Sequence, residues 1–173
     1  MGNLTCCFTG HRPQALPFGF DEQDRRCIRM RFLLWNLLNK LITEKNVKHF
    51  ISGMALGVDQ ICAEVVLELK ARHPEITLEC AFPCETQAIK WSDSQRERYY
   101  RIASECVKET MLQHHYTNDC MKNRNKYMVD NSDIVIAVWN GKPSGTGSTV
   151  RYAHEKGKTI IVIDPETLNI RII

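Results

Sequence analysis

The order of apolar segments along the chain is the feature that most limits how it can fold. Runs of β-prone residues alternate with longer segments whose apolar residues recur every three or four positions. We expect strands at 4–9, 49–51, 77–82, 107–112, 134–139 and 159–163, and a further edge strand at 169–173. We expect helices at 22–44, 58–69, 92–105, 119–131 and 144–156. The alternation predicts a Rossmann-like three-layer α/β/α sandwich with a mainly parallel sheet of about six strands.

Two segments indicate where the core lies. Residues 134–139 are apolar throughout, as is typical of a central strand covered by helices on both faces. The first long helix has apolar residues at helical spacing, and we expect these to face the core: Ile28, Phe32, Trp35, Leu38 and Ile42.

Composition narrows the class of protein. The chain has 173 residues, 43% hydrophobic and 25% charged, so we expect one domain over 1–173. A net charge of +3 does not require nucleic acid, which we do not expect as a partner. No apolar stretch approaches the roughly 20 residues of a membrane span, and no secretory signal is visible, so we expect a cytoplasmic protein with no membrane partner. We expect the eight cysteines to be reduced and buried; their spacing is not that of a zinc site, and we expect no metal or cofactor.

Glycine and polar residues follow three of the predicted strands. The first turn is Gly10-His11-Arg12-Pro13, and the second, at 52–59, contains Ser52, Gly53, Ala55, Gly57 and Asp59. The third follows the central strand and contains Ser144, Gly145, Thr146, Gly147, Ser148 and Thr149. In a parallel sheet such turns share the edge where ligands bind, and the amides of a helix's first turn attract anions. Each turn alone is also compatible with a purely structural role.

Further candidates surround these turns. Arg124 and Asn125 lie near the start of the helix 119–131, and we expect both to point outward, although a solvated basic helix face is the plainer interpretation. Asp59 suits either a ribose hydroxyl or a helix cap. Trp91 and Trp139 could stack on a base, but a core or interface role is the simpler account.

Together and in this order, these segments resemble the SLOG superfamily, named for DprA and the Lonely Guy enzymes. Residues 52–59 are similar to the SG-x-A-x-G-x-D motif of the DprA branch. Residues 121–133, with the next strand and 143–148, are similar to the Lonely Guy pattern M-x-x-R-K-x-x-M, S-D and PGG-x-GT. A resemblance to the YpsA/YoqJ-like bacterial and phage group rests on residues 7–13, on Pro83, Cys84, Gln87 and Trp91, and on residues 127–133.

The resemblance implies a pocket for nucleotides or their derivatives. Lonely Guy members cleave the N-glycosidic bond of a nucleoside monophosphate, other members bind ADP-ribose-type signals, and DprA binds single-stranded DNA. The chain departs from the Lonely Guy motif, because Arg151 stands at the position of its catalytic Glu and Asn125 replaces a basic residue. A cation at 151 opposes an oxocarbenium-like transition state. Glu155 lies one helical turn further on, and Asp59 is the better remaining carboxylate candidate.

We therefore favour a module that binds a phosphorylated nucleotide derivative, such as an ADP-ribose-like signal, without necessarily cleaving it. In this interpretation Arg12, Arg124 and the glycine-rich loops hold phosphates, while Asp59 holds a ribose hydroxyl. One alternative is a nucleotide N-glycosidase or phosphoribohydrolase of Lonely Guy type that uses Asp59 and Arg124. A second is a single-stranded nucleic-acid or protein-interaction module. Family analogy and the apolar residues Phe32, Leu34 and Trp35 favour a homo-oligomer.

Overall fold

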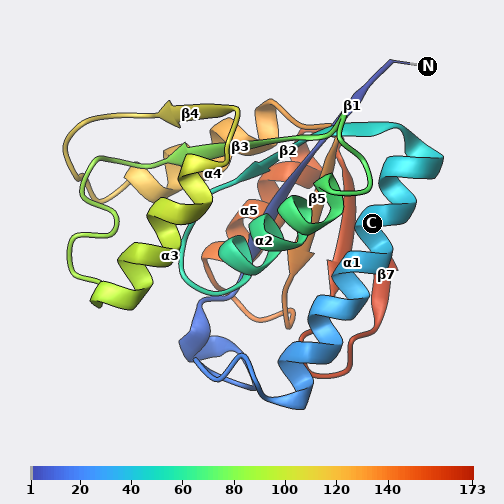
Figure 1. Cartoon of the computed structure of the whole chain (residues 1–173), viewed down its shortest axis with the longest axis horizontal. Helices are drawn as coiled ribbons and strands as arrows, with labels where there is room; N and C mark the ends of the chain where they lie inside the picture. The colour runs from blue at the N-terminus through green and yellow to red at the C-terminus, as the bar shows by residue number, and fades with distance from the viewer. Residues whose placement is uncertain (1) are drawn as a thin grey trace.

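A computed structural model describes residues 2–173, in which seven strands form one sheet in the order β4-β3-β2-β1-β5-β6-β7 (Figure 1). The strands are β1 Leu4–Gly10, β2 Val47–Ser52, β3 Thr77–Phe82, β4 Lys108–Met111, β5 Ile134–Val138, β6 Thr159–Ile163 and β7 Ile170–Ile172. Strands β1 to β6 are parallel, and β7 pairs antiparallel with β6. The predicted Rossmann-like α/β class is confirmed. The sheet has seven strands because the C-terminal tail adds an edge.

Five α-helices cover the two faces of this sheet. They are α1 Arg25–Lys45, α2 Val58–Lys70, α3 Asp93–Ser104, α4 Cys120–Asp130 and α5 Gly145–Glu155, and a 3-10 turn spans Pro13–Ala15. Alternate strand residues pack on opposite sides: Phe8 lies with α1, α2 and α3, whereas Cys7 lies with α4 and α5. In Figure 1, α1 and α2 lie in front of the sheet. The layers are therefore three helices, one sheet and two helices.

Local signals account for the element ends. Helix α1 begins where the Asp24 carboxylate accepts a hydrogen bond from the Arg26 amide at 2.8 Å, and it ends at Asn46, whose φ is 57°. Strand β3 stops directly before Pro83, which cannot donate to a ladder. Helix α3 begins with a capping box between Ser92 and Gln95.

The buried face of α1 differs from the prediction. The residues that face the core are Cys27, Met30, Leu34, Leu38, Leu41 and Ile42. Ile28 and Phe32, expected in the core, are 51% and 70% exposed. Two apolar stripes run along this helix, and the sequence pattern does not tell which one packs against the sheet.

Cys80 and Cys106 form a disulfide, so the expectation of eight reduced thiols is wrong for this pair. Their Cα atoms lie 6.4 Å apart because β3 and the segment leading into β4 are neighbours. The pairing joins residues 26 positions apart, and nothing in the spacing pointed to it. The other six cysteines are free and buried.

A buried carboxylate connects the β4 edge to α4. Glu79 on β3 is 2% exposed. Its Oε1 atom accepts hydrogen bonds from Thr110 Oγ1 at 2.7 Å and Tyr127 Oη at 2.6 Å, and its Oε2 atom lies 2.9 Å from His49 Nε2. Burial alone raises the pKa of Glu79, but these neighbours outweigh it, so the pKa lies below its ordinary value.

Candidate functional site

Three turns meet at the carboxyl edge of the sheet because β1 lies between β2 and β5. We call them the first turn (10–13), the second turn (52–59) and the third loop (139–149). His11 connects all three. Its amide donates to Val138 O at 3.3 Å, its carbonyl accepts from the Val58 amide at 3.4 Å, and its Nε2 accepts from the Asn140 amide at 3.2 Å.

His11 is buried, and burial lowers the pKa of its ring below the ordinary value although the contact with Asn140 acts the other way. A neutral ring fits its role as an acceptor at Nε2. The sequence places His11 and Arg12 together in the first turn, at the edge where ligands bind. The structure turns His11 inward and leaves Arg12 exposed.

Several polar groups of the second turn are hydrogen-bonded to one another. Ser52 Oγ accepts from the Met54 amide at 3.2 Å and donates to Asp59 O at 2.8 Å. Asp59 Oδ2 accepts from the Ala55 amide at 3.3 Å. Asp59 is buried at the start of α2, so its carboxylate caps this turn rather than standing in an open cleft.

Two glycines allow the turns to approach one another. A Cβ atom at Gly10 would lie 2.5 Å from the side chain of Val58. Gly57 has a φ of 92°, and a Cβ there would lie 2.7 Å from the carbonyl oxygen of His11. Both positions require glycine for steric reasons.

Arg124 departs most clearly from expectation, because its side chain is buried and only 3% of the residue is exposed. One Nη atom donates to the carbonyl of Gly53, and Nε donates to Asn125 Oδ1 at 2.9 Å. The prediction that Arg124 points outward is therefore wrong; Asn125 is partly exposed. A Cβ at Gly53 would lie 2.7 Å from the guanidinium carbon. Glycine at 53 thus makes room for the arginine.

Three charged side chains interact beneath this edge. Burial raises the pKa of Asp59, and the nearby Arg124 and Arg12 oppose the rise. Burial lowers the pKa of Arg124. The negative charge of Asp59 opposes this decrease, and the positive charge of Arg12 adds to it. Gln87 Nε2 adds a second donor to Gly53 O at 3.2 Å. Asp59 and Arg124 are therefore buried beneath this edge, whereas Arg12 remains exposed, and the phosphate-binding role of the two arginines stays a prediction.

The third loop presents the start of α5. Ser144 Oγ accepts from the Gly147 amide at 3.0 Å and caps the helix. Gly147 packs on the ring of Trp139, where a Cβ would lie 3.1 Å from Cζ2. Trp139 Nε1 donates to Lys142 O at 2.7 Å, so this ring supports the loop. Gly145 is exposed, and a Cβ there would meet nothing within 4 Å.

A cleft of 520 Å³ lies between α4 and α5, and we call it the α4–α5 cleft. Of the predicted site residues, the cleft contains Asn125, Gly145, Ser148 and Thr149. Side chains that were not predicted as site residues also line it: Asn118, Met121, Lys122, Lys126 and Tyr152. Arg151 and Glu155, weighed above as catalytic positions, line it too. Lys122 and Lys126 are four residues apart on α4, a spacing that could have placed them on one helix face, whereas Asn118 precedes the helix.

The other predicted residues lie around this cleft rather than in it. The first and second turns do not line the cleft, and neither does Arg124 on α4. The predicted residues that are absent from the lining are Gly10, His11, Ser52, Gly53, Ala55, Gly57, Asp59 and Arg124. Ser144 and Gly147 line a neighbouring cleft of 410 Å³ beside Trp139. Thr146 is buried. Trp91 packs edge-on against Tyr99, with ring centroids 5.3 Å apart.

Within residues 2–173, no three or more His, Cys, Asp or Glu side chains are grouped so that they could hold a metal ion. None of the helices in this same range combines the length and apolar character needed to cross a bilayer.

A mainly parallel sheet with this strand order, and with glycine-rich turns at its carboxyl edge, defines a Rossmann-like protein. The YpsA family, described as the YspA SLOG family, matches residues 6–168, and the chain belongs to it.

Named relatives agree with this assignment. The SPbeta prophage-derived protein YoqJ of Bacillus subtilis is 33% identical over 138 residues, which cover 73% of this chain and 81% of YoqJ. A UPF0398 protein of Bacillus cereus is 30% identical over 156 residues, which cover 87% of this chain and 82% of the relative.

Two solved structures share the fold. DprA of Helicobacter pylori, whose structure concerns its single-stranded DNA binding mode, aligns with a TM-score of 0.64 at 20% identity. The alignment covers 93% of this chain and 65% of that one. DprA of Streptococcus pneumoniae aligns with a TM-score of 0.63 at 14% identity, over 94% of this chain and 50% of that one. The chain thus spans about half to two thirds of these structures.

Proposed function

We propose that this protein binds a phosphorylated nucleotide derivative, ADP-ribose-like or a related signalling nucleotide, in the α4–α5 cleft and senses or sequesters it. The observation that carries the proposal is the exposed start of α5 at Gly145, which opens into this cleft. Amides in the first turn of a helix have no carbonyl partner within the helix and favour a phosphate.

The charges around the cleft support an anionic ligand. Lys122, Lys126 and Arg151 all line it, against one acidic side chain, Glu155. The volume of 520 Å³ falls within the usual range for small-molecule sites, roughly 300–1,000 Å³. Asn125 adds a polar group that can orient a ribose or a base.

Binding without cleavage is the favoured outcome. Asp59, the carboxylate considered for catalysis, is buried and bound to the Ala55 amide. Arg151 brings a cation to the cleft where the Lonely Guy motif has its Glu. Glu155 is the acidic side chain in the cleft lining, so a glycosidase activity would have to use it.

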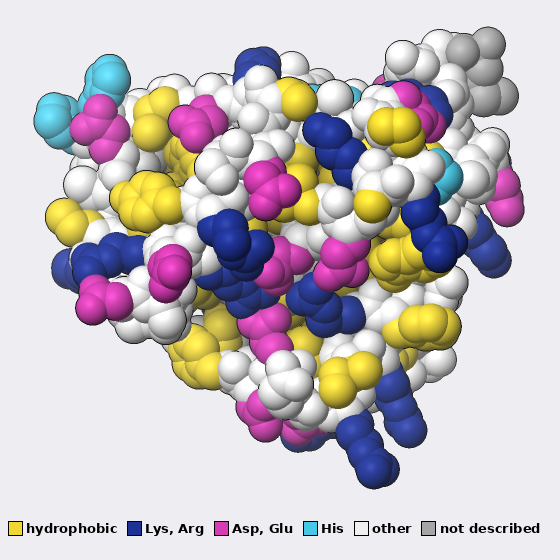
Figure 2. All heavy atoms as spheres, viewed as in Figure 1, with side chains coloured by type: hydrophobic (Ala, Val, Ile, Leu, Met, Phe, Trp, Pro, Cys, Tyr) yellow, Lys and Arg dark blue, Asp and Glu magenta, His cyan; other side chains and the backbone are white. Residues whose placement is uncertain are grey.

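Single-stranded nucleic acid is the second candidate, and the resemblance to DprA favours it more than the charge balance suggested. A row of cations beside an open cleft suits a phosphate backbone. Against it, the net charge of the chain is only +3. The face shown in Figure 2, where α1 and α2 lie in front of the sheet, mixes acidic and basic side chains, while the α4–α5 cleft lies on the opposite face.

The decisive variants change Gly145, where a side chain meets open space. Gly145→Asp places a carboxylate in the phosphate position and should abolish the thermal stabilisation produced by ADP-ribose or AMP, while Gly145→Ala should retain most of it. Mass spectrometry of small molecules released on denaturation tests the wild type directly. A full thermal shift in Gly145→Asp would refute this site.

Two further experiments distinguish ligand binding from glycosidase activity and from single-stranded DNA binding. Release of free base from AMP, lost in Glu155→Gln, would favour an enzyme. Binding of an oligothymidylate whose affinity falls steeply with salt, and further in a Lys122→Glu, Lys126→Glu double variant, would favour single-stranded DNA.

We also propose a homo-oligomer that buries the exposed residues Ile28 and Phe32 on the outer side of α1. Light scattering of the wild type and of Phe32→Glu tests this, and a monomeric wild type would contradict it.

A further inference from the structure

A third cleft opens at the same edge of the sheet, on the face covered by α2 and α3. It has a volume of 350 Å³ and lies between residues 13–22, the start of α2 and the start of α3. We call it the α2–α3 cleft. Over residues 2–173, it has no lining residue in common with the α4–α5 cleft.

A buried acceptor without a partner lines this cleft. Gln60 on α2 is 0% exposed. Its Nε2 donates to Met54 O at 3.1 Å, while its Oε1 has no hydrogen-bond partner within residues 2–173. Buried amide oxygens in folded proteins nearly always accept a hydrogen bond. Because the bond to Met54 fixes which end of the carboxamide is nitrogen, Oε1 is the atom left without a partner, and Gln60 is one of the residues that line the cleft.

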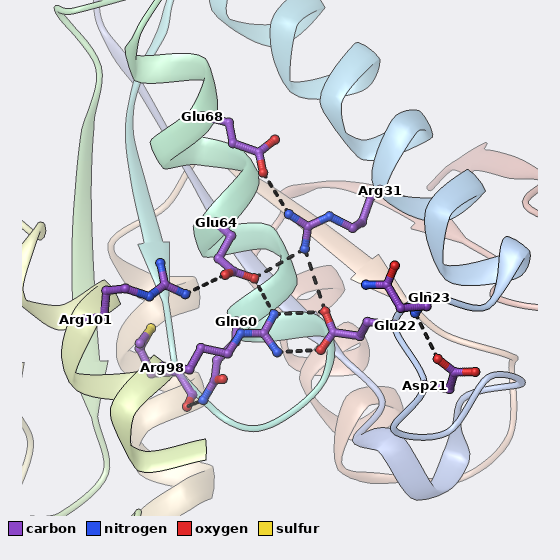
Figure 3. Close-up of polar contacts among 10 residues, drawn as sticks. Asp21, Glu22, Gln23, Arg31, Gln60, Glu64, Glu68, Arg98 and Arg101 are labelled. Carbon is purple, nitrogen blue, oxygen red and sulfur yellow. Dashed lines mark hydrogen bonds and ion pairs between the residues drawn. The ribbon is translucent and has the colours of Figure 1, made fainter. Parts of the chain in front are cut away.

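The charged groups beside Gln60 are already neutralised. Figure 3 shows Arg98 between Glu22 and Glu64, and its guanidinium pairs with both carboxylates. The start of α3 is closed as well, since Ser92 Oγ accepts from the Gln95 amide at 3.3 Å and Gln95 Oε1 accepts from the Ser92 amide at 3.0 Å. These groups give an anion little to bind, so the cleft suits a neutral ligand.

The remaining walls are largely apolar and partly aromatic. Phe18, Phe20, Leu56 and Ile61 line the cleft. Phe20 is 59% exposed, so one face of its ring is available to a flat group. A ligand that fits both features is planar and carries an N–H donor at one edge.

We propose that the α2–α3 cleft binds a neutral, flat heterocycle with an amino group, of the nucleoside class, whose amino group donates to Gln60 Oε1 while its ring lies against Phe20. This site does not depend on the proposed function of the α4–α5 cleft.

The test uses pairs of nucleosides that differ only by the amino group. Adenosine is compared with purine riboside, and guanosine with inosine, by isothermal titration calorimetry. At least one amino-bearing nucleoside should bind, and its partner without the amino group should bind at least tenfold more weakly, because the buried acceptor is then left unpaired.

Variants assign the binding to this cleft. Gln60→Met, similar in size and without the acceptor, should abolish the difference between the two nucleosides. Phe20→Ala, at an exposed position, should weaken binding severalfold and keeps the test valid if Gln60→Met does not fold. Phe32→Ala on α1 is the matched control, because this exposed side chain lines neither cleft, and it should leave nucleoside binding unchanged.

Three results would overturn the proposal. They are no binding of adenosine or guanosine at millimolar concentration, unchanged discrimination in folded Gln60→Met, and a crystal structure in which an ordered water donates to Gln60 Oε1 while the nucleoside lies elsewhere.

Discussion

Replacing Gly53 by alanine should expel Arg124 from its buried position. The new Cβ would lie 2.7 Å from both the guanidinium carbon and one Nη atom, closer than atoms of these types approach. The guanidinium would lose its charge-assisted hydrogen bond to Gly53 O, a contribution of about 1.5–3 kcal/mol. Asp59 would also lose a neighbouring cation while remaining buried. We expect the free energy of unfolding to fall by about 2–4 kcal/mol.

Urea unfolding followed by tryptophan fluorescence measures this change. With a slope of about 2 kcal/mol/M, the midpoint should fall by about 1–2 M. Gly145→Ala is the matched control, because its Cβ meets nothing within 4 Å, and it should change stability by less than about 0.5 kcal/mol.

A double-mutant cycle isolates the cause. In an Arg124→Met background the guanidinium is absent, so Gly53→Ala should cost much less than in the wild type. If the glycine substitution costs the same in both backgrounds, or destabilises the wild type by less than about 0.5 kcal/mol, the steric account of Gly53 is wrong.

Three further predictions concern other parts of the fold. The pKa of Glu79 lies below its ordinary value of 4.5, so its stabilising effect is present above pH 4.5 and is lost as the pH falls through the lower pKa of the folded state. Glu79→Gln should therefore flatten the loss of melting temperature below pH 4.5, and an unchanged slope would contradict this. Gly57→Ala should lower the free energy of unfolding in urea by about 2–4 kcal/mol, because residue 57 has a φ of 92° and the new Cβ would lie 2.7 Å from His11 O. A loss below about 1 kcal/mol would contradict this. Arg98→Met breaks the ion pairs of Arg98 with Glu22 and Glu64, and the first of these holds Glu22 to α3. We expect the free energy of unfolding to fall by about 1–2 kcal/mol and limited proteolysis near residues 16–24 to become faster. An unchanged cleavage rate would show that other contacts hold this segment.

The sequence predicted the order of elements well because the signals are local. Thr77–Phe82 is bounded by a proline, and the expected helix 58–69 agrees with α2 to within one residue because its apolar period is regular. The antiparallel direction of β7 and the exposure of Phe32 were not predictable. Both depend on which surfaces meet in three dimensions, and periodicity does not carry that information.

The sequence predicted which turns lie together, but it did not predict how their side chains are oriented. The three turns do meet at one edge, as the topology of a parallel sheet requires. A basic residue on a helix is normally exposed, so nothing local revealed that Arg124 is buried against Gly53. The unpartnered oxygen of Gln60 is likewise visible only once its neighbours are placed.

The three hydrogen bonds of His11 have a consequence for recognition at this edge. They join the segments that follow β1, β2 and β5 before any ligand arrives. Ordering loops on association costs conformational entropy, and here folding has already removed most of that freedom. A molecule entering beside these turns should therefore find a preformed receptor, and free and occupied crystals should superimpose closely over residues 10–13 and 52–59.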